Sequence, residues 1–262
     1  SMFTSIKPIV VMLGVHRSGT SLSARIFAEL GLKLGDSLLP GHRDNPEGFW
    51  EHGRVVAETR MMEKKLGINP FSGDRLAPPE GSWWKTPPFA EQYNNLKAVI
   101  EEETAADGLF GFKDPRTLQL LPMWQALFKE LKLDPRYVLL LRHPEAVAAS
   151  MKKRNKLRFM QGQFIWAYHI SYGIQQLDSP PAAIVHYENW FCDLSGQLAQ
   201  IAPTVDFDPA GLEEAEKRIR RFVDTGKAHF HGRKQDSELI PQADDLYRVL
   251  TNGRSADWDE VV

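Results

Sequence analysis

The chain has 262 residues, of which 42% are apolar and 25% charged, and this composition excludes wholesale disorder. Its 32 Lys and Arg residues nearly balance 34 Asp and Glu residues, so the net charge of −2 argues against a protein that binds nucleic acid through its bulk charge. The single cysteine, Cys192, excludes an intrachain disulfide and a cysteine-based zinc site, and it favours a reducing, cytoplasmic location. We expect no signal peptide and no membrane span, because no apolar run approaches roughly 20 residues.

Short aliphatic stretches followed by helix-like sequence predict a parallel sheet. Residues 9–13, 137–141 and 182–185 have the composition of buried strands, and residues 109–112 are a fourth candidate. Strand followed by helix, several times over, predicts an α/β fold in which helices flank a parallel sheet of four or five strands.

Apolar spacing predicts the helices between these strands. Residues 20–30 carry one apolar stripe, and a second stripe comprises Val55, Thr59, Met62 and Leu66. Pro144 opens a further helix, and residues 213–223 form a charged amphipathic one. The proline-rich segment 67–88 is either a functional loop or lid, or a surface excursion pinned by Trp83 and Trp84. The polar chain after Phe222 has no assignable core.

A glycine-bearing turn, residues 14–21, joins the first predicted strand to its helix. Gly14 and Gly19 have the spacing of a phosphate-binding P-loop, but Thr20 stands where a kinase or ATPase has lysine. The positive charge lies inside the loop, at Arg17, and no aspartate at a strand end is evident for Mg²⁺. The turn therefore predicts a phosphate cradle without the kinase lysine; the alternative is a purely structural glycine turn.

Two separated motifs resemble those of sulfotransferases that use 3′-phosphoadenosine 5′-phosphosulfate (PAPS). VVMLGVHRSGTSL resembles the loop that binds the 5′-phosphosulfate, and YVLLLRHPEAVAAS resembles the 3′-phosphate motif, with Ser150 eight residues after Arg142. GFKDPRT, IVHYENW and DNPEGFWE are lesser matches, and the last is typical of bacterial carbohydrate-type members. The resemblance covers about residues 9–202. It is to the R-S-G-T branch, since the cytosolic mammalian branch has lysine in the loop and tryptophan at the position of Leu22.

This resemblance implies a P-loop-like sulfotransferase fold, as a single domain over residues 2–262, and a set of site residues. The implied donor is PAPS, which leaves as adenosine 3′,5′-bisphosphate, and no metal is required. Arg17 and Lys113 are the implied catalytic cations. The implied nucleotide-binding residues are His16, Arg17, Ser18, Gly19, Thr20, Ser21, Arg142, Ser150, Arg154 and Tyr187.

The acceptor hydroxyl must lose a proton, so a general base is required. We expect Glu51 in this role, because it precedes Val55 by four residues on the inward stripe and related R-S-G-T enzymes use a glutamate in this segment. Asp114 is expected to be a structural partner of Lys113. The remaining candidates for the base are His42, Asp44, Glu47 and His52.

Three further groups of basic or aromatic residues could belong either to the site or to the rest of the structure. The basic run Lys152, Lys153, Arg154, Lys156 and Arg158 is either a solvated helix face or, through Arg154, support for the 3′-phosphate. The group Trp166, Tyr168, His169 and Tyr172 is expected to pack in the core, with acceptor contact as the alternative. Basic residues at 227–233 lie where the family closes a loop on the 3′-phosphate, and His229 and His231 do not predict a metal site.

The sequence therefore predicts in-line transfer of a sulfuryl group from PAPS to a hydroxyl of a small molecule or carbohydrate. Two rivals remain: a P-loop kinase of a small molecule, and a non-catalytic nucleotide-binding protein. No nucleic-acid partner is expected, and the oligomeric state cannot be inferred.

Overall fold

The computed structural model describes residues 6–35, 38–40, 50–71, 76–226 and 239–252. In this part of the chain, four parallel strands form one sheet in the order β2-β1-β3-β4. The strands are β1 (Lys7–Leu13), β2 (Gly111–Lys113), β3 (Leu133–Leu141) and β4 (Ala183–His186). The α/β fold with a parallel sheet is therefore confirmed.

The third strand begins four residues earlier than its aliphatic run predicts. Leu133 pairs with Lys7, and Pro135 pairs with Ile9, at the partly exposed start of β3. Proline cannot donate to a strand ladder and is normally found at edges or strand starts, so composition gives no strand signal here. Residues 133–136 belong to β3 because they pair with β1, although their composition does not predict a strand.

Helices connect the strands, and further helices follow the last strand, β4. The α-helices are α1 (Thr20–Glu29), α2 (Gly53–Leu66), α3 (Pro87–Ala105), α4 (Leu121–Glu130), α5 (Pro144–Asn155), α6 (Phe159–Gln176), α7 (Asn189–Cys192), α8 (Leu194–Ile201), α9 (Leu212–Gly226) and α10 (Pro241–Asn252). Three short 3₁₀ helices are η1 (Trp83–Lys85), η2 (Ala202–Val205) and η3 (Pro209–Gly211). The four predicted helices correspond to α1, α2, α5 and α9.

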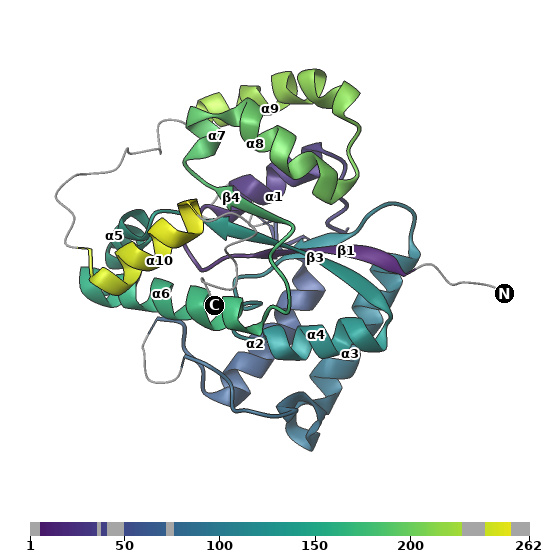
Figure 1. Cartoon of the computed structure of the whole chain (residues 1–262). Helices are drawn as coiled ribbons and strands as arrows, with labels where there is room; N and C mark the ends of the chain where they lie inside the picture. Colours follow the sequence, from purple (N-terminus) through teal and green to yellow (C-terminus); the bar gives the residue numbers. More distant parts are fainter. Residues whose placement is uncertain (1–5, 36–37, 41–49, 72–75, 227–238, 253–262) are drawn as a thin grey trace.

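Helices cover both faces of the sheet. Ile9, Val11 and Leu13 of β1 point into one hydrophobic core, whereas Val10 and Met12 point into the other. Figure 1 shows α1, α7, α8 and α9 on one side and α2, α3, α4 and α6 on the opposite side. Burial of both faces explains why the strands are continuous aliphatic runs and do not alternate with polar residues.

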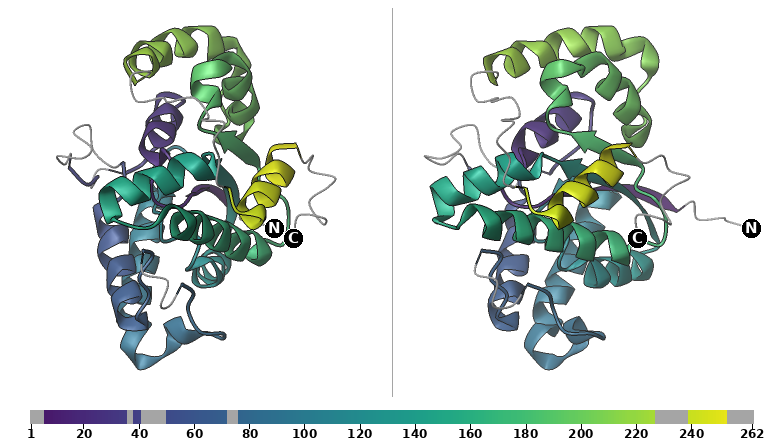
Figure 2. Two further views of the ribbon diagram at one scale, coloured as in Figure 1. Left: turned by 90° about the vertical axis from the view of Figure 1, so that its left-hand side faces the viewer. Right: turned by 60° about the vertical axis from the view of Figure 1, so that its left-hand side comes forward.

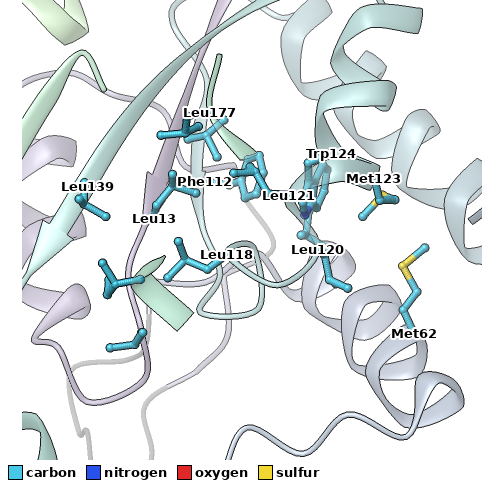
Figure 3. Packing of buried hydrophobic residues seen from close by; sticks show 14 of the residues in the cluster. Leu13, Met62, Phe112, Leu118, Leu120, Leu121, Met123, Trp124, Leu139 and Leu177 are labelled. Carbon is cyan, nitrogen blue, oxygen red and sulfur yellow. The ribbon is translucent and has the colours of Figure 1, made fainter. Parts of the chain in front are cut away.

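The larger core includes a row of aromatic rings that joins β2 to α4. Phe112 of β2 stacks at a tilt on Trp124 of α4, with 4.7 Å between ring centroids, and Trp124 stacks in turn on Phe128. Figure 3 shows Leu13 and Leu139 from β1 and β3 in the same cluster. This packing fixes β2 against the helices, and β2 ends at Lys113.

The proline-rich segment 67–88 and the tail after Phe222, whose roles the sequence left open, both contribute residues to this core. Trp83 and Trp84 are buried with their rings in edge-to-face contact, so they pin the segment before α3 as one of the two interpretations requires. The polar tail, to which the sequence assigned no core, contributes α10, which packs on α5 and α6 and buries Ala243 and Leu250 (Figure 2). Polar residues dominate α10 because only one face of it is covered.

Among the described residues, no helix has both the length and the apolar character needed to cross a bilayer.

Candidate functional site

The carboxyl ends of the four parallel strands lie at one edge of the sheet. The predicted phosphate loop follows β1, Lys113 ends β2, Arg142 follows β3 and Tyr187 follows β4. From β1 the chain continues to β2 on one side, and from β3 it continues to β4 on the other. Open α/β sheets bind ligands at such a switch point, outside the strand ends.

The loop between β1 and α1 presents backbone N–H groups that no side chain caps. Arg17 and Gly19 both have left-handed backbone angles, with φ of 67° and 68°. Gly19 is the N-cap of α1, no side chain accepts a hydrogen bond there, and the first turn of α1 has no acidic residue. Ser18 is 2% exposed, and among the described residues its Oγ has no hydrogen-bond partner. Uncapped amides at a helix N-terminus and a buried hydroxyl without a partner suit a bound phosphate group.

Gly19 is required by space as well as by its backbone angle. A Cβ at this position would collide with the ring of Tyr187, which follows β4. The phosphate loop and the end of β4 are therefore in direct contact. Burial raises the pKa of Tyr187, so the ring stays a neutral phenol at this contact.

Arg142 joins the end of β3 to both neighbouring strand ends. Its Nη1 donates to the backbone carbonyl of Arg17 at 3.2 Å, and its guanidinium carbon lies 4.6 Å from the centroid of the Tyr187 ring. Glu188 adds a second link, since its Oε1 accepts from the backbone N–H of His143 at 2.9 Å. The three strand ends thus form one connected unit around the loop.

Lys113 and Glu51 form a buried ion pair on the other side of the loop. The Lys113 Nζ is 3.6 Å from Oε1 of Glu51 and 3.5 Å from Oγ of Ser21. Lys113 is 2% exposed and Glu51 is 7% exposed. Burial lowers the pKa of Lys113, and Glu51 opposes this effect. Burial also raises the pKa of Glu51, and Lys113 opposes it. Each partner therefore favours the charged form of the other, and this attraction offsets part of the effect of burial on both pKa values.

The predicted position of Glu51 on a helix is wrong. α2 begins at Gly53 with His52 as its N-cap, so Glu51 lies in the extended segment before the helix. An isolated antiparallel bridge between Leu38 and His52 holds this segment, and the carbonyl of Glu51 accepts from the N–H of Leu39 at 2.8 Å. The stripe itself is confirmed, since its four members in α2 are buried.

The other candidates for the base are placed elsewhere or lie outside the described residues. The His52 Nε2 is 3.7 Å from a carboxylate oxygen of Glu103 on α3, so this ring is directed toward α3. Both carboxylate oxygens of Asp114 accept hydrogen bonds, from Thr59 and from Arg116. These bonds to Thr59 and Arg116 support a structural role for Asp114. Residues 41–49, which hold the remaining three candidates, are not described.

His16 carries the contact between the phosphate loop and the proline-rich segment. Its ring centroid is 5.0 Å from that of Phe71, and burial keeps the pKa of His16 well below its ordinary value. His169 of α6 is also buried, with a pKa lowered to about 4, and it contacts the amide of Gln119. Trp166 and His169 are core residues as expected, whereas Tyr168 is partly exposed.

Ser150 and Arg154 are predicted residues that the structure does not join to the rest of the site. Ser150 is half-buried on α5 and Arg154 is exposed there; within the described ranges, no hydrogen bond links either to Arg142. The whole basic run from 152 to 158 is exposed, which agrees with a solvated helix face. Basic residues at 227–233 lie outside the described residues.

Arg116, Glu63 and Glu188 are site-adjacent residues that the sequence analysis did not single out. Arg116 and Glu188 stand inside two quoted motifs, GFKDPRT and IVHYENW, which was the available signal. Glu63 carries no such signal, because a charged residue in a helix normally faces solvent. No group of three or more potential metal ligands occurs among the described side chains.

Solved structures that share this fold include two sulfotransferase domains. The sulfotransferase domain from the Synechococcus PCC 7002 olefin synthase is 15% identical, with a TM-score of 0.53 over 95% of this chain and 96% of that one. The sulfotransferase domain from the curacin biosynthetic pathway is 18% identical, with a TM-score of 0.52 over 94% and 98% of the two chains. No protein-family model and no curated protein sequence matches the chain. The chain therefore has the fold of sulfotransferase domains, which is the fold that the resemblance of its motifs implies.

The contact between Gly19 and Tyr187 generates a prediction about stability. Gly19→Ala should destabilise the protein by about 1–3 kcal/mol beyond the cost of a left-handed alanine, because the new methyl group overpacks against the ring. Gly67→Ala is the matched control, since Gly67 has φ of 72° and a Cβ added there would meet no atom within 4 Å. Urea unfolding of both variants measures the difference; equal losses would show that the ring contact is unimportant.

Proposed function

We propose that the protein transfers a sulfuryl group from PAPS to a hydroxyl acceptor. One observation carries this proposal: a buried Lys113–Glu51 pair and the Arg142–Tyr187 pair flank the same uncapped phosphate loop. A donor with a phosphosulfate at its 5′ end and a phosphate at its 3′ position needs cations at two separate places. The sulfotransferase fold of the chain supports the same assignment.

Each part of PAPS has a partner of suitable chemistry in this arrangement. The amides of residues 14–21, with Ser18 and Arg17, would hold the 5′-phosphosulfate. Arg142 uses one of its five N–H donors on the carbonyl of Arg17, which leaves others for the 3′-phosphate. Ser150 and Arg154 would complete that site from α5. Tyr187 offers an aromatic surface to the adenine.

The Lys113–Glu51 pair supplies the chemistry of the transfer. Negative charge develops on the oxygen that bridges phosphate and sulfur as the S–O bond breaks, and Lys113 and Arg17 are the cations for it. Glu51 takes the proton of the acceptor hydroxyl while the hydroxyl oxygen of the acceptor bonds to sulfur. A sulfuryl group carries less negative charge than a phosphoryl group, so we expect this transfer to need no Mg²⁺.

A small molecule or carbohydrate with a reactive hydroxyl is the proposed acceptor, and a cytoplasmic location is the proposed setting. A small-molecule kinase is the main rival, but Thr20 occupies the position of its lysine. A non-catalytic nucleotide-binding protein would have no use for a buried glutamate beside Lys113.

Nucleotide binding tests the donor. Adenosine 3′,5′-bisphosphate without Mg²⁺ should raise the melting temperature of the protein, because binding to the folded state alone stabilises it. Adenosine 5′-monophosphate is the matched control and should stabilise less, since it lacks the 3′-phosphate. Stronger stabilisation by Mg²⁺-ATP in the same thermal-shift assay would favour the kinase.

Arg142→Ala tests the 3′-phosphate site. The substitution should weaken binding of adenosine 3′,5′-bisphosphate by about 2–4 kcal/mol and abolish the preference over nucleotides without a 3′-phosphate. Arg136→Ala is the control, because Arg136 lies on the same strand at the opposite edge of the sheet, where it pairs with Asp206. Isothermal titration calorimetry measures both. An unchanged preference in Arg142→Ala would exclude this contact.

Glu51→Gln tests the base. We expect turnover to fall about 10²-fold or more with nearly unchanged nucleotide affinity, since shape is kept and basicity is lost. In the wild type, activity should rise with pH as Glu51 ionises, at a higher pH than for an ordinary glutamate because burial raises its pKa. This acid limb should vanish in Glu51→Gln. Near-normal turnover would transfer the role to Glu47 or His52.

A further inference from the structure

Arg116 is a buried arginine that links the two elements carrying Lys113 and Glu51. Its Nη1 donates at 2.8 Å to Oδ1 of Asp114, the residue that follows Lys113 in the sequence. Its Nε donates to Oε1 of Glu63 on α2 at 3.0 Å. A second link runs in parallel, because Oγ1 of Thr59, also on α2, donates to the other oxygen of Asp114. The turn after β2 is thus tied twice to α2, the helix that begins immediately after Glu51 and His52.

This geometry connects the network to the reacting pair. Lys113 is the last residue of β2, and Glu51 lies two residues before α2, so the position of each depends on one of the two tied elements. The side chains of Asp114, Arg116 and Thr59 are buried, which leaves little room for alternative arrangements. We propose that Arg116, held by Asp114 and Glu63, is a positioning residue that fixes Lys113 and Glu51 relative to each other for the transfer step. The inference rests on the proposed function for its catalytic readout.

Electrostatics gives the network a second, separable effect. The charges that act on Glu51 belong to Lys113, Asp114, Arg116 and Arg60, and those that act on Lys113 belong to Glu51, Asp114 and Arg116. The positive charge of Arg116 lowers the pKa of both Glu51 and Lys113, whereas the negative charge of Asp114 raises both. The two charges therefore oppose each other at the reacting pair.

The forked guanidinium is central, because a lysine cannot reach two carboxylates in this planar arrangement. Arg116→Lys keeps the charge and loses the fork. We expect its kcat to fall about 10- to 100-fold, the scale for misplaced catalytic groups, while nucleotide affinity and both limbs of the pH–rate profile change little. Arg136→Lys is the matched control, since Arg136 makes a similar 3.0 Å pair with Asp206 at the far edge of the sheet. Its kcat should be that of the wild type.

Charge removal predicts opposite shifts that a merely structural role would not produce. Arg116→Gln should move the acid and basic limbs of kcat to higher pH, and Asp114→Asn should move both to lower pH. The double variant removes both charges, so its limbs should return toward those of the wild type. It also leaves no unpaired carboxylate at position 114, so it should fold better than Arg116→Gln, in which both Asp114 and Glu63 lose their partner.

A ligand-free measurement separates this inference from the proposed function. Side-chain NMR titration of Lys113 and Glu51 should show the same opposite shifts in Arg116→Gln and Asp114→Asn without any donor or acceptor. If the wild type transfers no sulfuryl group, the proposed function fails whatever the titrations show. The positioning role is overturned if Arg116→Lys has wild-type kcat, or if the two charge-removing variants shift neither the limbs nor the titrations.

Discussion

Parallel pairing of β1 with β2 on one side and β3 on the other is the constraint on which the site depends. Because the strands run in the same direction, their carboxyl ends share an edge, and each strand places one functional segment there. The phosphate loop lies at the middle of this edge, between Lys113 and Arg142. Register matters as well, because Met12 pairs with both Lys113 and Val138 and thereby sets how far each strand end projects.

The two sides of the loop are held by different physics. On the side of β3 and β4, the contacts are close packing and cation–π attraction: Tyr187 lies against Gly19 and under Arg142. On the side of β2 and α2, buried ionic groups alternate in sign from Glu51 through Lys113 and Asp114 to Arg116 and Glu63. Such a network is expensive to desolvate and gains little net stability, but it rejects alternative arrangements of its members.

Glu63 shows the cost of that arrangement. Burial raises its pKa to about 7 despite the nearby guanidinium of Arg116. A carboxyl whose folded pKa exceeds the ordinary value stabilises the folded state below about pH 4.5, and this contribution is lost as the pH rises through 7. Stability is thus given up near neutral pH at the place where the turn after β2 is tied to α2. Such a cost is common where charge placement serves function.

Local sequence by itself determined most of the four strands and the loop between β1 and α1. Aliphatic runs and glycine spacing are local signals, and they identified β1 and the loop with Arg17 and Gly19. The resemblance to sulfotransferase motifs, and not these local signals, added Arg142 after β3 and Tyr187 after β4. Only the tertiary structure decided where Glu51 sits, that Asp114 serves Arg116, and that the polar helix α10 belongs to the core. These facts depend on contacts between residues far apart in the chain, such as Thr59 with Asp114 and Leu38 with His52. Periodicity indicates which face of a helix is apolar. It does not indicate where a helix begins when an isolated β-bridge to a distant residue holds the preceding residues extended.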